Sequence, residues 1–424
     1  MIWLYRALLT ALLPIAVVAL AVADRIAGKR RPRWADRLLR QPPDMAAGGL
    51  WLHAVSVGEV EIARRLVAEI ARAPLELPVV VTATTATGLD LARRTMGAEL
   101  TVLPCPLDLP GPVGRLLGAA RPREVAVVET ELWPEMLYQA GRRGIPVAVI
   151  NARLSDASYR RYRRVRWVLA PLLEPISLVL ARSGADAERF TALGVPLDAV
   201  RVTGNIKYDL EVDSTPLPWA DDLRAAAGDR PILVAGSTME GEEAVLLEAV
   251  ARLAEAGRPP VLVLAPRHPE RFDPVADLVT RSGLVMTRRR FDEPPVPDTT
   301  VFLLDTIGEL ARAYGLATMA FIGGSLVPTG GHNPLEPAVW GVPVVSGRHV
   351  DNFDEVYGEM VGAGAAVLVD GVDALTAAVT AWIDDPVARR AAGDAGRRVV
   401  DANRGATGRT VAALVELAAQ GPQG

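Results

Sequence analysis

Residues 321–345, FIGGSLVPTGGHNPLEPAVWGVPVV, decide the fold of this chain. The apolar run at 319–322 predicts a buried strand, which breaks at two glycine pairs before a short helix that has Pro334 in its first turn. Gly341 ends that helix, and a second apolar strand follows it. A strand, a glycine-rich loop and a helix N-terminus in this order are typical of an α/β fold that presents backbone N–H groups to an anion.

The glycine-rich loop of this stretch has two interpretations. In the first, the backbone of Gly323, Gly324 and Ser325 binds a phosphate, and Glu336 accepts hydrogen bonds from two sugar hydroxyls. In the second, the glycines only permit a tight crossover between two strands. Two glycine pairs next to a His-Asn-Pro-Leu-Glu run favour the anion site.

Length and composition set the broad class of the protein. The chain has 424 residues, half of them hydrophobic, so it can bury a core in about two or three domains. The single cysteine, Cys105, excludes an intramolecular disulfide, and one cysteine with four histidines makes no zinc-type cluster. The net charge of −4 argues against a nucleic-acid partner.

The N-terminus carries a hydrophobic run at residues 7–23 that is long enough for a membrane. Only Arg6 precedes this run, whereas seven basic residues follow it between residues 25 and 40. This charge distribution places everything after residue 24 in the cytoplasm and disfavours the alternative, a cleaved signal peptide. We expect an uncleaved membrane anchor over residues 1–23, spanning or deeply interfacial, with the basic segment against anionic lipids.

Glu59 is the first candidate for catalysis. The run from Gly49 to Val55 predicts a strand, and apolar residues at helical spacing follow from Glu59 onward. Glu59 therefore lies at a helix N-terminus at the carboxyl end of a strand, where open α/β sheets bind ligands. The helix dipole favours the ionised carboxylate that a general base needs. The same carboxylate could simply cap the helix, and spacing alone leaves both interpretations open.

Apolar runs alternate with helical stretches over the first half of the chain and predict a doubly wound α/β domain. We expect strands at residues 49–55, 77–82, 100–103, 125–128, 147–150 and 176–181. Several of these runs end in polar clusters, which include Glu129 and Asn151. Because the carboxyl ends of parallel strands share one edge of a sheet, we expect the clusters to gather beside Glu59.

The segment 159–167, YRRYRRVRW, has five arginines in nine residues with aromatic residues between them. One interpretation is a solvated basic helix. The other is a patch that binds a phosphorylated, membrane-embedded acceptor. Arginine binds phosphate in a bidentate manner, and aromatic side chains suit the membrane interface.

A second α/β series follows a polar, proline-containing segment at residues 211–220, where we expect an interdomain linker. We expect its strands at residues 232–235, 261–265, 301–304, 319–322 and 342–345. Two similar halves with polar loops at their strand ends predict a small-molecule site between facing domains. The sequence has no P-loop motif and no metal-ligand cluster, so Arg267 and Lys207 are the cations expected to neutralise a leaving phosphate.

Eight motifs then occur in an order that is typical of one family. They are HAVSVGE, ETELWP, NARLS, GNIKYD, GEE after Ser237 and Thr238, APRHPERF, DTIGEL and GGSLVPTGGHNPLEP. Together they closely resemble the 3-deoxy-D-manno-octulosonic acid (Kdo) transferases that act on lipid A precursors in Gram-negative bacteria. The resemblance covers nearly the whole chain, including the expected anchor.

The resemblance implies a GT-B fold with two facing Rossmann-like domains. It implies an inverting transfer of Kdo from CMP-Kdo to a lipid A precursor (lipid IVA), without a metal or another cofactor, in lipopolysaccharide core biosynthesis. The reaction would take place on the cytoplasmic face of the inner membrane. The expected domains are a membrane anchor at 1–23, an acceptor domain at 24–210 and a CMP-Kdo donor domain at 211–424.

The family's functional residues carry over by motif. Glu59 corresponds to the general base, and Glu129 and Lys207 correspond to residues that support the transition state. The CMP-binding segments correspond to Pro266, Arg267, Ile307, Gly308, Glu309, Asn333, Pro334, Leu335 and Glu336.

The chain departs from the family pattern at three positions. Met239 stands where a histidine is usual, Glu135 where an asparagine is usual, and Arg348 where a proline is common. Met239 puts in doubt any polar contact that a histidine makes there. The four histidines, which we interpret as satisfied structural residues, all lie within motifs and are His53, His268, His332 and His349.

Three other functions are open from the sequence. A GT-B transferase that uses a UDP-sugar would bind UDP better than CMP. A UDP-sugar epimerase of the same architecture would not need the N-terminal anchor. A membrane-anchored binding protein without activity would not need the intact set Glu59, Lys207, Arg267 and Glu336.

Overall fold

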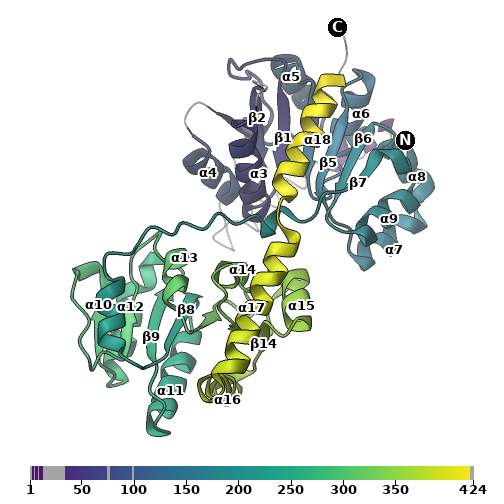
Figure 1. The fold of residues 1–424 in the computed structure, drawn as a ribbon. Coiled ribbons are helices and arrows are strands. Elements are labelled where there is room, and N and C mark those ends of the chain that lie inside the picture. The colour runs from purple at the N-terminus through teal and green to yellow at the C-terminus, as the bar shows by residue number, and fades with distance from the viewer. Residues whose placement is uncertain are drawn as a thin grey trace. The chain divides into compact units, whose positions relative to one another are not determined.

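The structure is a computed structural model that describes residues 2–3, 5–7, 9–12, 34–73, 77–97 and 100–420. The chain divides into two compact units, Met1–Asp209 with Arg404–Gly424 and Leu210–Asn403, which we call the N-terminal unit and the C-terminal unit. Each unit has a parallel β-sheet covered by helices (Figure 1). The prediction of an α/β fold with two Rossmann-like halves is confirmed.

The N-terminal unit has a seven-stranded sheet in the order β3-β2-β1-β4-β5-β6-β7, and all neighbouring strands are parallel. The strands are β1 (Leu50–Ala54), β2 (Val79–Ala83), β3 (Thr101–Pro104), β4 (Glu124–Val128), β5 (Val147–Ala152), β6 (Ile176–Ala181) and β7 (Val200–Val202). The strand order reverses between β1 and β4. The carboxyl ends of these two strands therefore form the topological switch point, where open α/β sheets bind ligands.

Helices cover both faces of this sheet. They are α2 (Trp34–Arg37), α3 (Val57–Ile70), α4 (Ala86–Thr95), α5 (Pro110–Ala120), α6 (Pro134–Arg142), α7 (Asp156–Arg164), α8 (Arg166–Leu173), α9 (Gly184–Leu193) and α18 (Ala406–Gln420), with short 3-10 helices η1 (Leu197–Ala199) and η2 (Ile206–Tyr208). One core joins the sheet to α3, α4 and α18, and the other joins it to α5, α6, α8 and α9. Because side chains alternate along a strand, Leu50 and Leu52 enter the first core and Trp51 enters the second.

The C-terminal unit repeats this plan with a parallel sheet in the order β10-β11-β9-β8-β12-β13-β14. The strands are β8 (Ile232–Thr238), β9 (Val261–Pro266), β10 (Met286–Arg288), β11 (Val301–Leu303), β12 (Met319–Ile322), β13 (Val344–Ser346) and β14 (Ala366–Leu368). Its order reverses between β8 and β12. The glycine-rich loop follows β12 and therefore lies at the switch point of this sheet.

Several helices of the C-terminal unit pack on its sheet through one apolar core. They are α10 (Ala220–Ala227), α11 (Glu242–Glu255), α12 (Phe272–Arg281), α13 (Leu310–Ala313), α14 (Leu335–Ala338), α15 (Asp354–Gly362), α16 (Gly371–Asp384) and α17 (Pro386–Asn403), with 3-10 helices η3 (Pro269–Arg271), η4 (Arg289–Phe291), η5 (Tyr314–Leu316) and η6 (Asp351–Phe353). The core joins Leu233 of β8 and Phe321 of β12 to α11, α12 and α16.

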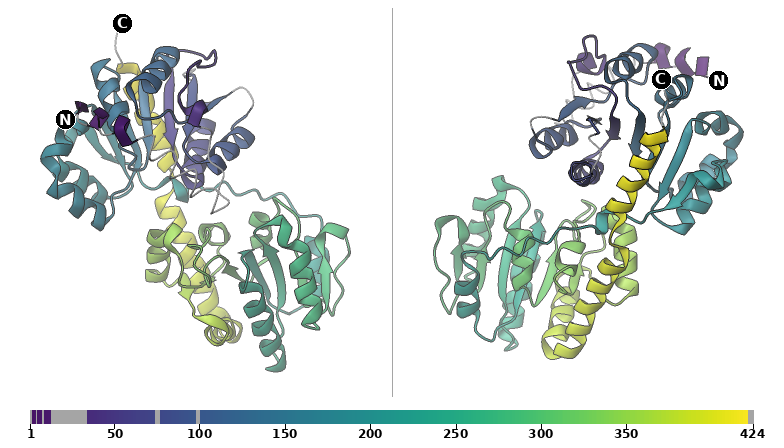
Figure 2. Two further views of the ribbon diagram at one scale, coloured as in Figure 1. Left: turned by 180° about the vertical axis from the view of Figure 1, so that it is seen from behind. Right: turned by 45° about the horizontal axis from the view of Figure 1, so that its top comes forward.

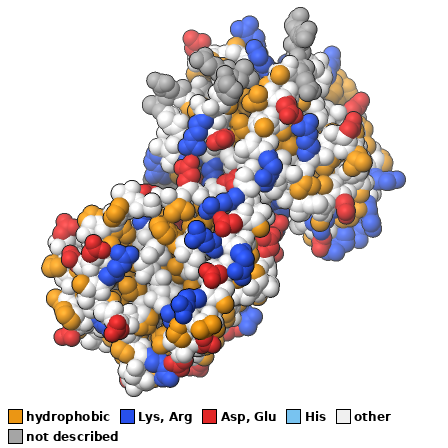
Figure 3. Space-filling view, in the orientation of Figure 1, with side chains coloured by type: hydrophobic (Ala, Val, Ile, Leu, Met, Phe, Trp, Pro, Cys, Tyr) orange, Lys and Arg blue, Asp and Glu red, His pale blue; other side chains and the backbone are white. Residues whose placement is uncertain are grey.

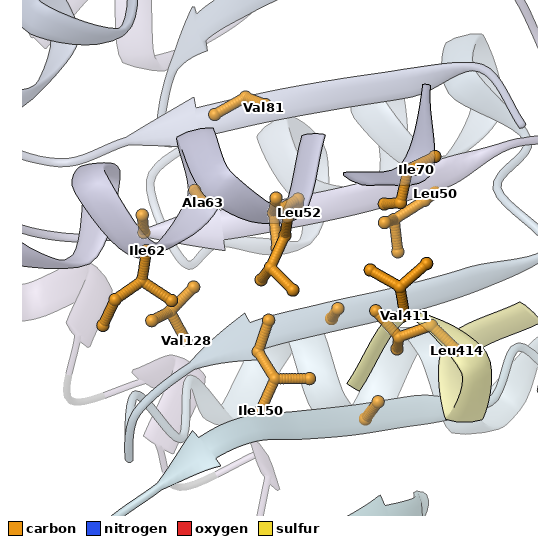
Figure 4. Close-up of a cluster of buried hydrophobic side chains, with 14 of the residues drawn as sticks. Leu50, Leu52, Ile62, Ala63, Ile70, Val81, Val128, Ile150, Val411 and Leu414 are labelled. Carbon is orange, nitrogen blue, oxygen red and sulfur yellow. The ribbon is translucent and has the colours of Figure 1, made fainter. Parts of the chain in front are cut away.

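The last helix, α18, packs in the N-terminal unit. Val411 and Leu414 lie against Leu50 of β1 in the same core (Figure 4). Both further views show α18 along the sheet of that unit (Figure 2). The expected donor domain at 211–424 includes this helix, whereas the structure buries the apolar face of the helix in the first half of the chain.

The expected anchor at residues 1–23 lies mostly outside the described residues. Within it, the structure describes residues 2–3, 5–7 and 9–12, which are helical. No helix in the described ranges combines the length and the apolar character that crossing a lipid bilayer requires.

Candidate active site

Glu59 lies at the start of α3, directly after β1. Ser56 is the N-cap residue of this helix, and its side chain accepts a hydrogen bond from the backbone N–H of Glu59. In return, the Glu59 carboxylate accepts hydrogen bonds from the backbone N–H of Val55 (2.8 Å) and from the Ser56 hydroxyl (2.9 Å). This reciprocal arrangement is close to a capping box, so the capping interpretation of Glu59 holds in the structure.

The surroundings of Glu59 also change its acidity. The residue is only 8% exposed. Its pKa is raised from 4.5 to about 7, first by burial and then by the nearby carboxylates of Glu129 and Glu131, while hydrogen bonds from Val55 and Ser56 act in the opposite direction. The helix dipole, which we expected to keep Glu59 ionised, is outweighed by burial. A carboxyl group that titrates near neutral pH is well matched to general-base catalysis.

Glu129 follows β4 on the other side of the topological switch point. Its φ of 60° lies in the left-handed region, which non-glycine residues rarely adopt. Its backbone N–H donates to the carbonyl of Ile150 (2.9 Å), and its carboxylate forms an ion pair with Arg182. The Arg182 side chain is almost fully buried, and its Nε donates to the carbonyl of Asn151 (3.1 Å). These contacts fix Glu129 close enough to Glu59 to influence its charge.

Lys207 lies in η2, which is tied to the helix that carries Glu59. Arg65 of α3 donates from Nη1 to the carbonyls of Ile206 (2.8 Å) and Lys207 (3.2 Å). The backbone N–H of Lys207 donates to Oδ1 of Asn205 (3.1 Å). The N–H of Ile206 donates to Oδ1 of the buried Asn151 (3.0 Å). The N-terminal unit therefore brings the three expected catalytic residues, from three distant motifs, to one end of its sheet.

Three residues that sequence reasoning did not assign hold this arrangement together. Arg182 directly follows the apolar run of β6, which is the same signal that pointed to Glu129. Asn151 has a φ of 50° and is buried, and neither property is visible in a sequence. Arg65 lies inside the helical stretch after Glu59, where nothing local distinguishes it from a surface arginine.

His53 has the structural role that the sequence analysis expected. Its ring is fully buried, and Nδ1 lies 2.9 Å from Oγ1 of Thr82. The ring also meets Trp133 edge to face, with ring centroids 6.0 Å apart. Burial lowers the pKa of His53 to about 4, so the imidazole is neutral at physiological pH.

The glycine-rich loop of the C-terminal unit does not offer free amides. The backbone N–H of Gly323 donates to the carbonyl of Gly236 (2.9 Å). The N–H groups of Gly324 (2.7 Å) and Ser325 (2.8 Å) donate to the carboxylate of Glu242, which is fully buried at the start of α11. The chain's own carbonyl and carboxylate accept the hydrogen bonds of these three amides, so the structure shows no free amide here for the predicted phosphate.

Glu242 accepts two more backbone hydrogen bonds. The N–H of Leu326 donates to its Oε1 (2.9 Å), and the N–H of Met239 donates to its Oε2 (2.8 Å). One internal carboxylate thus joins the loop after β12 to the loop after β8 across the switch point. The predicted anion-binding geometry is present, and the anion is a side chain of the protein.

The helix after the glycine-rich loop is shorter than an anion site needs. α14 is a four-residue helix, and Pro334 is its N-cap residue rather than part of its first turn. The N–H of Leu335 donates to Oδ1 of Asn333 (3.1 Å), so this amide is occupied as well. Glu336 is half-buried and lies near Tyr314, since its charge contributes to raising the pKa of that tyrosine.

Arg267 is exposed directly after β9. Its backbone N–H donates to the carbonyl of Thr238 at the end of β8 (3.0 Å), which aligns the two loops. Pro266 is the last residue of β9 and pairs with Thr238. Arg267 therefore follows the strand next to the switch point, and its charge acts on His332 in the loop after β12. A guanidinium there has the chemistry to bind a phosphate.

The segment 307–309 combines an exposed backbone with a buried carboxylate. Ile307 is 71% exposed, and Gly308 has a φ of 90° with open space around it. Glu309 is buried and accepts hydrogen bonds from Nε1 of Trp219 (3.2 Å) and Nη2 of Arg289 (3.3 Å). Glu309 thus holds the loop in place while the backbone of Ile307 and Gly308 faces solvent.

The basic segment 159–167 forms α7 and the start of α8. None of the residues in α7 is buried. Arg160, Arg161, Arg163, Arg164 and Arg166 are all exposed, and Trp167 is 77% exposed. Basic side chains are visible at the edge of the N-terminal unit where Figure 1 shows α7, whereas both signs of charge are interspersed elsewhere (Figure 3).

No group of three or more His, Cys, Asp or Glu side chains in the described part of the chain is arranged to hold a metal ion. The groups with the chemistry to act on a ligand are the carboxylates of the N-terminal unit and the cations and exposed loops of the C-terminal unit.

Comparison with known proteins gives a consistent family. The sequence profile described as "3-Deoxy-D-manno-octulosonic-acid transferase (kdotransferase)" matches residues 32–210. The chain is 38% identical over 388 residues to the 3-deoxy-D-manno-octulosonic acid transferase of Haemophilus influenzae, which covers 89% of this chain and 90% of that protein. It is 37% identical over 388 residues to the enzyme of the same name from Bordetella pertussis, with 88% of each chain covered.

Solved structures of other proteins share the fold. The UDP-GlcNAc 2-epimerase from Neisseria meningitidis, solved with UDP-GlcNAc bound, matches with a TM-score of 0.56 over 88% of this chain and 100% of that chain. The sequence identity is 15%, so this likeness shows the GT-B-like fold alone.

Proposed function

The chain belongs to the 3-deoxy-D-manno-octulosonic-acid transferase family, and on that premise we propose that it transfers Kdo from CMP-Kdo to a lipid A precursor, lipid IVA, with inversion at the anomeric carbon. Kdo transfer from CMP-Kdo in lipopolysaccharide core biosynthesis is the activity of this family. The chain is thus a CMP-Kdo-dependent glycosyltransferase. The inverting mechanism, the acceptor and the residue roles that follow belong to the proposal.

Glu59 is the proposed general base. Its carboxylate takes the proton from the acceptor hydroxyl as the hydroxyl oxygen attacks the anomeric carbon of Kdo. The bond from that carbon to the phosphate oxygen breaks in the same step, and CMP leaves with the bonding electrons. The observation that carries this proposal is the position of Glu59, a buried carboxylate that Val55 and Ser56 hold at the topological switch point. Its pKa, raised to about 7, suits a group that accepts a proton near neutral pH.

Glu129 and Lys207 are the proposed supports of the transition state. The Glu129 carboxylate is held by the buried Arg182, so it supplies fixed negative charge near a developing oxocarbenium ion. The backbone of Lys207 is held by Arg65 and Asn205, which limits where its ammonium group can reach. A positioned ammonium group opposes the negative charge that builds up on the leaving phosphate.

The proposed donor site is on the C-terminal unit. The cation of Arg267 neutralises the phosphate, and the exposed backbone of Ile307 and Gly308 offers polar atoms to the cytosine base. Glu336, with the loop of Asn333, Pro334 and Leu335, binds the ribose hydroxyls. Gly323, Gly324 and Ser325 shape the loop, and their amides are not part of the proposed phosphate site.

We also propose that the enzyme works at the cytoplasmic side of the inner membrane. The hydrophobic run at 7–23, the basic residues that follow it and the exposed arginines of α7 all suit an anionic lipid surface. Trp167 is exposed at the same place, and tryptophan favours the interface between water and lipid.

The contacts of residues 5 and 6 favour an interfacial anchor over a spanning one. The Tyr5 hydroxyl donates to Oδ2 of Asp108 (2.7 Å), and Arg6 forms two 2.8 Å hydrogen bonds with the fully buried carboxylate of Glu135. A spanning helix with residue 24 in the cytoplasm would place residues 5 and 6 at the opposite surface, about 30 Å from that unit. With these contacts both residues lie against the N-terminal unit, which supports the proposed interfacial anchor.

Cysteine labelling tests this topology. The only native cysteine, Cys105, is buried, so a Trp3→Cys variant adds one exposed thiol and Leu197→Cys supplies a matched control on the catalytic unit. In inside-out vesicles, a membrane-impermeant maleimide is expected to label both variants. Labelling of Trp3→Cys only from the periplasmic side would show that the anchor spans the membrane.

A product-mass experiment tests the reaction. The purified full-length protein is incubated with CMP-Kdo and tetraacylated lipid IVA, and the lipid product is weighed by mass spectrometry. We expect a mass increase equal to one or more Kdo residues, and the increment counts the residues added. An unchanged lipid together with intact CMP-Kdo would contradict the proposed function.

A nucleotide titration separates the proposal from enzymes that use UDP-sugars. We expect the protein to bind CMP more tightly than UMP or UDP, as measured by calorimetry. Preference for UDP would favour a UDP-sugar transferase or an epimerase.

A further inference from the structure

A phosphate bound to the C-terminal unit needs hydrogen-bond donors, and two expected sources are already used. The amides of Gly324 and Ser325 donate to Glu242. The amide of Leu335 donates to the side chain of Asn333. The phosphate must therefore be recognised mainly by side chains at the carboxyl ends of β9 and β12.

His332 lies on the glycine-rich loop at this place. Its backbone N–H donates to the carbonyl of Gly323 (3.2 Å), and the N–H of Gly331 donates to the carbonyl of Gly324 (2.7 Å). A Cβ atom on Gly324 would lie 3.0 Å from both Cδ2 and Nε2 of His332. The edge of the imidazole ring is thus held directly over the loop.

The Nε2 atom of His332 is buried, and no described residue forms a hydrogen bond with it. We interpreted this histidine from the sequence as a satisfied structural residue, and the structure does not agree. A buried polar atom without a partner is rare in native proteins and needs an explanation. His53, whose Nδ1 is paired with Thr82, shows what a satisfied histidine looks like in this chain.

Arg267 and His268 are close neighbours of this ring. Burial lowers the pKa of His332 to about 4, and the charges of Arg267 and His268 contribute to this effect. The imidazole is therefore neutral at physiological pH and can donate from only one nitrogen. The three side chains come from the loops after β9 and β12 and form one polar cluster.

We propose that Nε2–H of His332 donates a hydrogen bond to the phosphate of the CMP group, while Arg267 supplies the positive charge. The proposal rests on the proposed function and names a binding residue that the CMP-binding segments carried over from the family do not include. The phosphate gains negative charge as its bond to Kdo breaks. A fixed donor at this point stabilises the departing CMP more than the bound donor substrate.

The side chain at position 239 makes His332 more important for phosphate binding in this chain. Met239 follows β8, and its backbone N–H is fixed by Glu242. Its thioether cannot donate a hydrogen bond to a phosphate, whereas the histidine that is usual at this position in the family can. His332 and His268 are then the imidazoles of this cluster, and of the two it is His332 that has a buried ring nitrogen without a partner among the described residues.

Affinity for CMP and for cytidine tests the contact. His332→Leu removes the donor, and His332→Gln places an amide N–H near the former Nε2 position. We expect His332→Leu to weaken CMP binding by about 10- to 100-fold, as for a lost hydrogen bond to a charged group, with cytidine affinity unchanged. His332→Gln should recover most of the CMP affinity. His349→Leu is the matched control, because His349 is exposed on a neighbouring loop.

The outcomes separate this inference from the proposed function. An equal loss of CMP and cytidine affinity in His332→Leu would assign His332 a structural role, and unchanged CMP affinity would remove it from the site. Failure of the native protein to prefer CMP over UDP would instead contradict the proposed function.

A measurement on the native protein covers the case in which His332→Leu does not fold. The chain has four histidines, so nitrogen-15 labelling of histidine gives few imidazole signals. We expect one Nε2 resonance, absent in His332→Gln, to shift with CMP and to stay unchanged with cytidine. If cytidine and CMP produce the same shifts, the phosphate contact is excluded.

Discussion

At the scale of single residues, Glu59 combines two roles that the sequence left as alternatives. Its carboxylate completes the N-terminal cap of α3 through Val55 and Ser56, and the same burial that permits this cap raises its pKa to about 7. Capping fixes the orientation of the group, and burial adjusts its basicity. The same carboxylate, in the same position, can therefore cap the helix and act as the proposed base.

The pH dependence of transfer follows from this pKa. A general base must be ionised, so we expect kcat/KM to rise with pH through about 7 and to level off above it. Glu59→Gln should abolish transfer and leave CMP binding unchanged. Near-normal turnover in this variant would remove Glu59 from its role as the base.

The stability of the folded protein should fall with rising pH, whereas the rate of transfer rises. The folded-state pKa of Glu59 lies above its ordinary value of 4.5. The protonated carboxyl therefore stabilises the folded protein fully below pH 4.5, and this stabilisation is lost as the pH rises to about 7. At 1.36 kcal/mol per pKa unit, the loss is about 3 kcal/mol. Chemical denaturation of Glu59→Gln should therefore show a smaller loss of stability over this pH range, and an identical pH profile would contradict the buried carboxyl.

Glu124 is a second buried carboxyl group, and it has no visible function. It is fully buried at the start of β4, and neither of its oxygens has a hydrogen-bond partner among the described residues. Burial raises its pKa to about 8. Glu124→Leu should raise the free energy of unfolding by about 1–3 kcal/mol at pH 7, and by more at pH 9, where the native carboxyl must ionise. Destabilisation at both pH values would show that Glu124 has a partner.

At the scale of elements, the glycine-rich loop has the geometry of an anion site, but the anion that it binds is a carboxylate of the protein itself. Glu242 precedes Gly324 by 82 positions, and its carboxylate accepts the hydrogen bonds that a phosphate was expected to accept. A buried carboxylate is costly unless several donors satisfy it, and here four backbone N–H groups do so. The loop is therefore preorganised before any ligand binds.

Removal of this carboxylate should destabilise the C-terminal unit. Glu242→Ala leaves four backbone amides, two of them buried, without their acceptor, and we expect a loss of more than about 3 kcal/mol in unfolding free energy. Glu242→Gln keeps one carbonyl oxygen and should lose less. Glu240→Ala is the matched control, since Glu240 is exposed two residues away. Equal stability of Glu242→Ala and Glu240→Ala would contradict the internal-anion role.

The sequence did not predict three of the edge strands, although it did predict β3 at the margin of the first sheet. The structure has β7, β10 and β14, each of three residues and each at the margin of a sheet. β7 includes exposed residues, so it lacks the apolar run that revealed the central strands. Short edge strands form because a neighbouring strand supplies the hydrogen bonds, and that neighbour is known only after folding.

At the scale of the whole molecule, the C-terminal helix returns to the first half of the chain. Asp209 accepts hydrogen bonds from the backbone N–H groups of Gly405 (2.6 Å) and Thr407 (2.5 Å). These bonds hold the start of α18 in place. Asp209 is the last residue of the GNIKYD motif. Part of a motif that we assigned to the reaction thus has a structural contact as well.

A change in α18 should affect the N-terminal unit, although the helix follows the C-terminal unit in sequence. Leu414 is fully buried against β1, and Leu414→Ala should cost about 2–5 kcal/mol. Calorimetry with and without CMP distinguishes the two unfolding transitions, because CMP stabilises the unit that binds it. In Leu414→Ala, we expect a lower melting temperature for the transition that CMP does not shift. If the melting temperature fell only for the transition that CMP stabilises, α18 would not belong to the N-terminal unit.

The sequence by itself determined the two α/β halves, the polar loops at their strand ends and the family, because apolar periodicity and motif order are local or collinear properties. It did not reveal that Glu242 occupies the glycine-rich loop, that burial raises the pKa of Glu59, or that α18 packs on β1. Each of these depends on a partner distant in sequence or on exclusion of water. Both are set only when the chain has folded, so only the tertiary structure decides them.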